Sequence, residues 1–304
     1  MGGPNNLNEV EVFLKNMFND KNIITLKSKL LRKFIAFMIV KSRKKEACEN
    51  YRQLGGSSPI VANTKKLIAK LAKKLPDFQV SYAMCYTPPF VKEALKKVSL
   101  CEELFVLPLY PHYSTTTIKS SMEDFYSHLR GDFKVKQIKE FYKNDLYNQL
   151  LVKLIRQTLN NDNSQDFDLI FSAHSLPQRV VDRGDVYQAQ VIEHVDILTK
   201  ILLKQGINFK NIHLAYQSKL GPVKWLEPEL GTKLKQLKNK KVIISPISFT
   251  IDNSETDFEL SIEYKEKARD LGFKDYRVCR CPNDDDDFVK TIISLLDVSV
   301  FGAE

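Results

Sequence analysis

Apolar and polar residues alternate along this chain with two periods, one typical of helices and one typical of buried strands. In residues 5–18 the apolar positions 7, 10, 13, 14, 17 and 18 follow the spacing of one helix face. The same criterion predicts helices over 27–54 (a long, broken stretch), 63–75, 115–129, 146–160, 187–205, 231–237, 255–271 and 284–296. Short β-branched or alternating runs predict strands over 78–86, 103–110, 133–141, 168–172, 213–216, 242–246 and 276–281.

Strand and helix alternate on both sides of the polar stretch 161–165. Repeated alternation of this kind predicts an α/β fold of two doubly wound, Rossmann-like halves, each a parallel sheet flanked by helices, with the active-site cleft between them. We place the N-terminal half at 1–162, joined by the final helical segment 284–304, and the C-terminal half at 163–283.

Composition is compatible with large cores and gives no sign of a membrane span. The chain has 304 residues, 43% of them hydrophobic, which is enough for two moderate α/β domains. The longest apolar run, 34–40, is far shorter than a transmembrane helix. No secretory signal is visible near the first residue, so we expect a cytoplasmic protein.

Cysteine usage agrees with a reducing compartment. The cysteines are Cys48, Cys85, Cys101, Cys279 and Cys281, an odd number without a Cys-x-x-Cys pair. A disulfide framework or a zinc ribbon is therefore not expected. Cys279 and Cys281 lie on the same side of a predicted strand, and we interpret them as small core residues rather than as a metal site.

Net charge is +9, and much of the excess lies between residues 27 and 45 around the apolar run 34–40. One interpretation is a solvated helix face. The other is attraction to an anionic partner, such as a membrane surface or a propionate-bearing substrate. Nucleic acid is not an expected partner, because no aromatic β platform, helix-turn-helix or zinc finger accompanies the charge.

Candidate chemistry lies where predicted strands end, in the polar segments 108–117, 172–175, 216–222 and 248–255. Ligands of open parallel sheets bind beyond the carboxyl ends of the strands, so these segments are predicted to face one cleft. His174 directly follows a buried strand and is the candidate base, because its pKa lies near working pH. The alternative is a histidine with only a packing role.

Glu255 follows the strand 242–246 and begins a helix that carries Glu259 and Glu263 at i+4 and i+8. This spacing stacks three carboxylates on one face, which favours a cation or a proton path. The alternative is a solvated acidic face neutralised by Lys265 and Lys267. The run 284–287 is interpreted as charge at a helix N-terminus rather than as a metal site.

Aromatic residues accompany these segments. Tyr113, Phe249 and Trp225 could clamp a flat aromatic substrate, and ordinary core packing is the alternative.

A set of motifs in a fixed order along the chain adds a second kind of evidence. They are Met1-Gly2-Gly3-Pro4 and the segments 51–60, 107–117, 171–177 with Arg183-Gly184-Asp185, 217–222 with Trp225, and 255–264. Together they cover essentially the whole chain, which by them resembles the ferrochelatase family, enzymes that insert ferrous iron into a porphyrin.

The resemblance implies specific roles. His174 and Glu255 would be catalytic and would face the metal, with Glu259 and Glu263 as outer metal sites. The porphyrin cleft would be lined by Met1, Arg43, Ser58, Tyr113 and Trp225, and the helix over 5–26 would form its apolar lip. The chelatase-type halves would convert protoporphyrin IX and Fe2+ into protohaem without an organic cofactor. No cysteine set matches that of cluster-containing members, so no iron–sulfur cluster is expected.

Two rival functions stay open at this stage, a ferrochelatase acting on coproporphyrin and a non-catalytic porphyrin- or haem-binding protein. The binder is suggested by the short N-terminus and by two departures from the family pattern. Asp252-Asn253 stands where the family usually has Asp-His or Glu-His, and Cys85 lies in a segment where it often has Arg. The expected partners are a porphyrin and ferrous iron, and peripheral contact with the inner membrane face is a further option.

The first residues carry one more expectation. The chain opens on the turn Gly2-Gly3-Pro4, directly followed by a predicted helix, and no β-branched run precedes it. A doubly wound domain normally begins with a central strand. We therefore expect about five to ten further residues upstream in the native protein, rich in Val, Ile or Leu.

Overall fold

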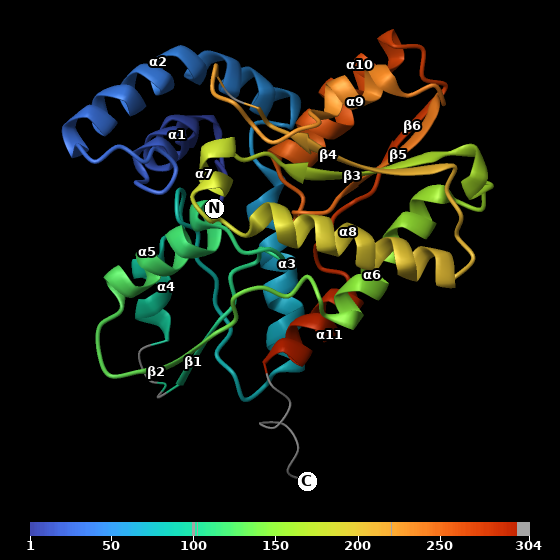
Figure 1. Ribbon diagram of the computed structural model, residues 1–304. Coiled ribbons are helices and arrows are strands. Elements are labelled where there is room, and N and C mark those ends of the chain that lie inside the picture. Colours follow the sequence, from blue (N-terminus) through green and yellow to red (C-terminus); the bar gives the residue numbers. More distant parts are fainter. Residues whose placement is uncertain (99–100, 102, 220, 297–304) are drawn as a thin grey trace. The chain divides into compact units, whose positions relative to one another are not determined.

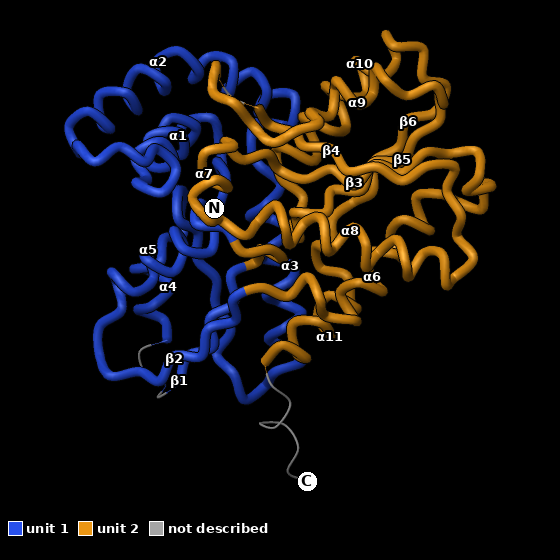
Figure 2. The backbone as a smooth tube through the Cα atoms, viewed as in Figure 1, with its two compact units in different colours: residues 1–108, 114–139 blue, residues 109–113, 140–304 orange. Residues whose placement is uncertain are grey.

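The computed structural model describes residues 1–98, 101, 103–219 and 221–296 (Figure 1). Its packing divides the chain into two units (Figure 2). Unit 1 comprises Met1–Pro108 and Ser114–Lys139, and unit 2 comprises Leu109–Tyr113 and Glu140–Glu304. The boundary between residues 162 and 163, which the strand–helix alternation predicts for the two halves, stays a prediction.

Unit 1 holds a small parallel sheet and several helices. Its elements are η1 (Leu7–Glu9), α1 (Val10–Asn19), α2 (Lys29–Gln53), α3 (Pro59–Lys74), α4 (Val91–Lys97), β1 (Glu103–Val106), the π-helix η2 (Thr115–Lys119), α5 (Ser120–His128) and β2 (Lys134–Gln137). β1 and β2 pair in parallel from Glu103↔Lys134 to Val106↔Gln137.

The long helix α2 differs from the broken stretch predicted for 27–54. Ser28 caps its first turn by accepting the Leu31 amide, and no Gly or Pro interrupts the 25 residues that follow. The helix ends before Gly55 and Gly56, whose positive φ angles of 81° and 92° suit glycine and stop the helix. The predicted break was therefore wrong.

The strand predicted over 78–86 was also wrong. Within the described residues this segment forms only an isolated bridge between Met84 and Phe90. The amides of Cys85 and Tyr86 instead donate to the carbonyl of Met1, at 3.1 and 3.0 Å. Its backbone groups are thus satisfied by a partner distant in sequence, which a local pattern does not reveal.

Unit 2 contains a larger sheet. Its elements are α6 (Asp145–Leu159), η3 (Ser164–Asp166), β3 (Asp168–His174), α7 (Gln178–Asp182), α8 (Tyr187–Lys204), β4 (Asn211–Gln217), α9 (Leu230–Gln236), β5 (Lys241–Pro246), the π-helix η4 (Glu255–Glu263), α10 (Tyr264–Asp270), β6 (Asp275–Val278) and α11 (Asp286–Leu295). The four strands pair in parallel in the order β4-β3-β5-β6.

Helices cover both faces of this sheet, which explains why its central strands β3 and β5 are buried along nearly their whole length. Leu230 and Leu234 of α9 and Leu260 of η4 pack against Ile170 and Ile244. On the other face, α8 contacts β4 and α6 contacts β5 (Figure 1). Each fully buried aliphatic side chain contributes about 1.5–3 kcal/mol relative to exposure. The prediction of an α/β fold with parallel sheets flanked by helices is confirmed.

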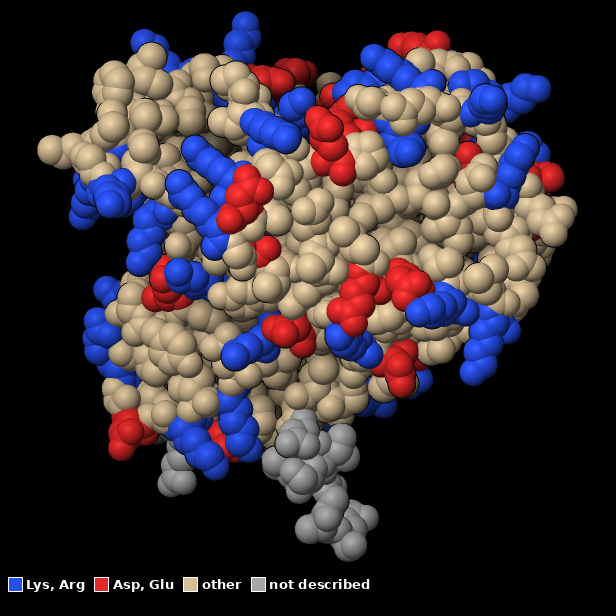
Figure 3. Space-filling view, viewed as in Figure 1, with Lys and Arg blue, Asp and Glu red and all other residues tan. Residues whose placement is uncertain are grey.

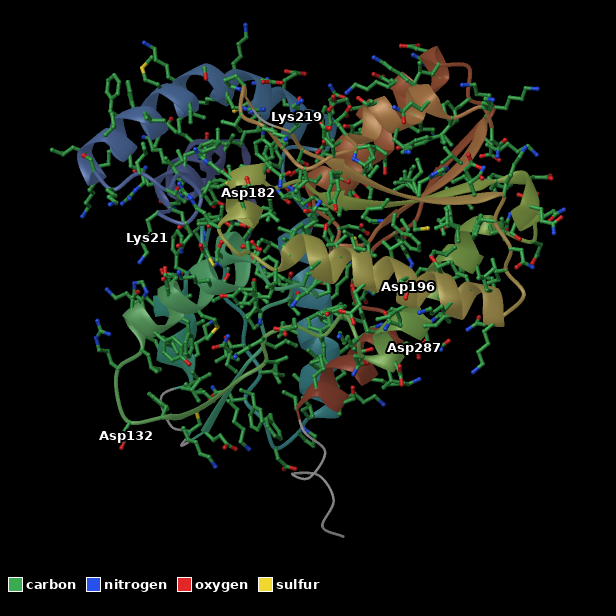
Figure 4. The ribbon with its side chains drawn as sticks, in the orientation of Figure 1. Lys21, Asp132, Asp182, Asp196, Lys219 and Asp287 are labelled. Atoms are coloured by element: carbon green, nitrogen blue, oxygen red, sulfur yellow. The ribbon has the colours of Figure 1, made fainter. Side chains whose placement is uncertain are left out.

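Two smaller predictions for unit 2 are confirmed as well. Cys279 and Cys281 are buried, with exposed fractions of 2% and 1%. Asp285 caps α11 by accepting the amide of Asp287. Lys153 lies 2.7 Å from the carboxylate of Asp287, which Figure 4 labels. The acidic run therefore belongs to a capped and neutralised helix N-terminus.

Candidate active site

The end of β3 positions the candidate base. His174 is the last residue of β3 and lies in register with Gln217, the last residue of β4. The preceding β3 residues are buried by helices on both faces, so pairing within the sheet fixes the backbone at this point. The amide of His174 donates to the Ser248 hydroxyl at 2.9 Å, which ties the loop after β5 to the end of β3.

Glu255 meets His174 from the first residue of the π-helix η4. Its Oε2 lies 2.7 Å from His174 Nδ1. The side chains of His174 and Glu255 are 35% and 26% exposed, so a substrate can reach them. Asn253 orients the start of this helix, because its Oδ1 accepts the Glu255 amide at 2.8 Å. The structure thus brings together the histidine and the glutamate that the sequence predicts to share a site.

Charge decides the protonation behaviour of this pair. Burial opposes protonation of His174, but attraction to Glu255 and the hydrogen bond with it outweigh burial and raise the pKa of the imidazole. Burial likewise favours a neutral Glu255, but His174 and the hydrogen bond from Ser218 lower the pKa of that carboxyl. Burial, followed by repulsion from Glu255, raises the pKa of Glu259 to about 7.

Ser218 connects the two carboxyl groups. Its hydroxyl lies 2.8 Å from Glu255 Oε2 and 2.6 Å from Glu259 Oε2, and its amide donates to Glu259 Oε1 at 2.8 Å. A left-handed backbone, with φ of 66°, turns Ser218 toward both. The serine hydroxyl carries one hydrogen, so a second bond of this kind needs a proton on one carboxyl group. The raised pKa of Glu259 fits that requirement.

Glu263 is in a different environment from the other two carboxylates. Lys267 pairs with it at 2.6 Å, and both side chains are more than two-fifths exposed. A lysine of this kind is the partner expected for a solvated acidic face. The row predicted from the i+4 spacing therefore divides into two residues that share Ser218 and one that pairs with solvent-exposed Lys267.

This arrangement has a definite chemical capacity. A neutral His174 can accept a proton, and the ionised Glu255 beside it stabilises the imidazolium that results. Imidazole and carboxylate are also suitable ligands for ferrous iron. Within the described ranges, no three His, Cys, Asp or Glu side chains form a set that could hold a metal ion. The ring of Phe249 packs edge-on against the His174 imidazole, with the two ring centroids 6.4 Å apart.

Comparison with known proteins agrees with this geometry. The model of the ferrochelatase family matches residues 1–299. A ferrochelatase from Nitratiruptor is 55% identical over 300 residues, covering 97% of this chain and 96% of the relative. A ferrochelatase from Sulfurimonas denitrificans is 54% identical over 301 residues, covering 97% and 95%. The chain belongs to the ferrochelatase family.

Family membership confirms the resemblance found in the motifs. It also confirms the enzyme class, because a ferrochelatase is a lyase that inserts iron into a porphyrin. Solved structures agree at the level of the fold. CbiX, the terminal enzyme of sirohaem biosynthesis in denitrifying bacteria, has a TM-score of 0.55 and 13% identity, covering 79% of this chain and 93% of that chain. SirB of Bacillus subtilis with Fe3+ has a TM-score of 0.51 and 10% identity, covering 78% and 91%.

Two of the residues that the ferrochelatase resemblance assigns to the porphyrin lie in unit 2 with the His174 pair. Trp225 forms an antiparallel bridge with Pro177, three residues beyond His174 in the sequence. Tyr113 is held by its amide, which donates to Gln190 of α8 at 2.7 Å. Trp225 is thus bonded to the segment that follows β3, and Tyr113 is bonded to α8, the next long helix after β3.

The other three residues assigned to the porphyrin lie in unit 1. The turn at Met1 reaches Ser58, because the carbonyl of Pro4 accepts the Ser58 amide at 2.8 Å. Gly2 is required there, since a Cβ at its φ of 95° would meet Thr87 Oγ1 at 2.5 Å. Arg43 lies on α2, with its guanidinium 4.0 Å from Glu46. The structure brings Met1 and Ser58 into one neighbourhood, and the roles of all three stay predictions.

Sequence reasoning missed two residues of this site. The sequence indicates Ser218 only as part of a polar strand end, and nothing in the local pattern predicts its left-handed backbone. Asn253 departs from the ferrochelatase pattern, and in the structure its side-chain oxygen accepts a hydrogen bond from the Glu255 amide. The signal that could have identified Asn253 is its place two residues before a helix start, where Asn often accepts a backbone amide.

Proposed function

We propose that this protein inserts ferrous iron into protoporphyrin IX to form protohaem, with His174 as the base and Glu255 as its partner. The observation that supports the assignment of residues is the 2.7 Å contact between His174 Nδ1 and Glu255 Oε2 at the carboxyl end of a parallel sheet. We propose Fe2+ and the porphyrin as substrates, and neither an organic cofactor nor an iron–sulfur cluster as a requirement.

Metal insertion releases the two pyrrole protons of the macrocycle, so the site must accept protons as the metal enters. His174 takes a proton from a pyrrole nitrogen, and Glu255 stabilises the imidazolium. The Ser218 hydroxyl then connects Glu255 with Glu259, a carboxyl group whose pKa near 7 suits proton exchange at neutral pH. One doubly charged ion enters as two protons leave, so the overall charge is unchanged.

We propose protoporphyrin IX over coproporphyrin because α2 presents an exposed apolar surface, and a protein with such a surface suits the less polar of the two porphyrins. Protoporphyrin carries two vinyl groups where coproporphyrin carries two more propionates, so it is the less polar substrate. The large hydrophobic side chains exposed on α2 are Leu30 (82%), Leu31 (48%), Phe34 (62%), Phe37 (57%) and Met38 (50%). Their spacing places them on one side of the helix. We call this the α2 stripe.

The α2 stripe also supports a peripheral contact with the cytoplasmic face of the inner membrane. Many lysines and arginines flank it between residues 27 and 45, and Figure 3 shows blue side chains beside a largely tan surface over α2. An apolar face with basic flanks is the pattern of helices that lie in a bilayer interface. No helix in the described part of the chain combines the length and apolarity that crossing a membrane demands.

The experiment is a turnover assay of the purified protein with ferrous iron and each porphyrin. We expect kcat/KM for protoporphyrin IX to exceed that for coproporphyrin by at least about tenfold, a difference of about 1.4 kcal/mol in barrier. The reverse preference would establish the coproporphyrin alternative. Quenching of porphyrin fluorescence without formation of metalloporphyrin would establish a binding protein instead.

Membrane contact has its own test, co-sedimentation with vesicles that contain anionic lipid. Phe34→Ser with Phe37→Ser should lower the bound fraction, because both side chains belong to the α2 stripe. The matched control is Ile192→Ser with Leu203→Ser on α8, where both side chains are also more than half exposed. Equal binding by the two double variants would contradict the assignment of the α2 stripe to the membrane.

A further inference from the structure

The backbone segment that carries Tyr113 is held by a cluster of buried side chains in unit 2. The Tyr113 amide donates to Gln190 Oε1 at 2.7 Å. Next to it, His112 Nε2 lies 2.9 Å from His194 Nδ1, and the carbonyl of Pro111 accepts two backbone amides. His112 and His194 are 2% and 0% exposed. Gln190 and His194 both belong to α8.

One face of α8 makes these contacts and also reaches the active site. Tyr187, Gln190 and His194 stand at i, i+3 and i+7, which places them on the same side of the helix. The Tyr187 hydroxyl donates to the backbone carbonyl of His174 at 2.9 Å. Asp196, labelled on α8 in Figure 4, pairs with exposed Lys200. The inward face of one rigid helix is therefore bonded to both the His174 carbonyl and the Tyr113 amide.

Hydrogen bonding fixes the tautomers of the histidine pair. The Asn148 side-chain amide donates to the Tyr142 carbonyl, which leaves Asn148 Oδ1 to accept from His194 Nε2 at 2.8 Å. His194 Nδ1 then carries no hydrogen and accepts from His112 Nε2. Within the described residues His112 Nδ1 has no hydrogen-bond partner. A core that needed only packing would avoid an unsatisfied acceptor, which costs about 1–3 kcal/mol.

We propose that Gln190 and the His112–His194 pair are positioning residues, which act through Tyr113 and fix its place relative to His174. The inference rests on the proposed function only in taking Tyr113 as a porphyrin contact. Without these bonds, the segment carrying Tyr113 can shift while the His174–Glu255 pair stays assembled. Porphyrin affinity should therefore change more than the rate of metal insertion.

The test is a double-mutant cycle between Gln190→Leu and Tyr113→Ala, read as the Kd for protoporphyrin IX by fluorescence and as KM and kcat by turnover. Gln190→Leu should raise Kd and KM about tenfold, or about 1.4 kcal/mol, with kcat within about twofold. In the Tyr113→Ala background the same change should have little further effect. The matched control is Gln205→Leu, at the exposed end of the same helix.

Additive effects of the two changes, or an unchanged Kd in folded Gln190→Leu protein, would overturn the proposal. The histidine pair supplies a second comparison. His112→Gln keeps an N–H donor for His194 and should retain near-normal Kd, whereas His112→Leu removes the donor and should raise Kd. Equal values for these two variants would also overturn it. Because Kd needs no turnover, a failure here is distinct from wild-type protein that does not form metalloporphyrin, which would overturn the proposed function.

Discussion

Unit 2 contains two histidine sites whose partners differ in charge. His174 lies beside the carboxylate of Glu255, and the pair raises the pKa of the imidazole despite burial. His194 lies beside another imidazole and an amide, and burial lowers its pKa to about 3. The carboxylate therefore makes His174 more basic, whereas His194 stays neutral. The partner, rather than burial alone, decides which histidine can act as a base.

Removing the His174 imidazole should have the largest effect on activity, and it tests this contrast directly. His174→Ala should lower kcat for metal insertion by about 10³-fold, because it removes the base that we propose takes the pyrrole proton. The Kd for porphyrin should change little, since stacking and apolar burial hold the macrocycle. Turnover assays and fluorescence titration check this, and near-normal turnover would exclude His174 as the base.

Glu255→Gln should lower kcat by about 10²-fold and also shift its pH dependence. In the wild type the rate rises as pH passes upward through the raised pKa of His174, because the base must be neutral. Without the Glu255 carboxylate, burial lowers the pKa of His174 against only the weaker attraction to Glu259, so the rise should move to lower pH. Glu263→Gln, which affects an exposed pair with Lys267, should leave kcat within about threefold. Equal small effects would favour a solvated acidic face.

The neutral pair should respond to acid through stability rather than catalysis. The pKa of His194 is about 3 in the folded protein and about 6.5 when unfolded. Its contribution is therefore complete above pH 6.5 and is lost as pH falls. Between pH 6.5 and 5 this loss is about 2 kcal/mol. Urea unfolding of His194→Gln should show a correspondingly smaller loss between pH 7 and pH 5, and an identical loss in both proteins would contradict the neutral assignment.

Only a small effect is expected at Asn253. Asn253→His should leave activity within about tenfold, less than about 1.4 kcal/mol of barrier, because the site needs one histidine base. A ring nitrogen of the new histidine can also accept the hydrogen bond from the Glu255 amide that Asn253 Oδ1 accepts in the natural protein. Turnover measured beside the wild type decides this. A very large gain would mean that the natural protein is a catalytically impaired relative.

The contrast also explains how far the sequence could predict the molecule. His174 and Glu255 followed from apolar runs that end in polar segments, because parallel strands bring such ends to one edge. His194 lies on the apolar stripe of α8 with Val191, Leu198 and Leu202, a placement that indicates burial but not its partner. The link to His112 joins positions 82 residues apart, and the Ser218 bridge depends on a positive φ. Tertiary contacts and local backbone geometry of this kind have no periodic signature.

The π-helix that begins at Glu255 has a consequence for insertions and deletions. Its i→i+5 bonds, such as that from the Tyr264 amide to the Glu259 carbonyl, accommodate more residues per turn than an α-helix. Deleting one residue between Glu259 and Tyr264 would let the segment close into ordinary α-helical turns. Everything on its N-terminal side would then rotate by about 100° about the helix axis, which would turn Glu255 away from His174. We therefore expect the chain length of η4 to matter for the proposed site as much as the identity of its residues.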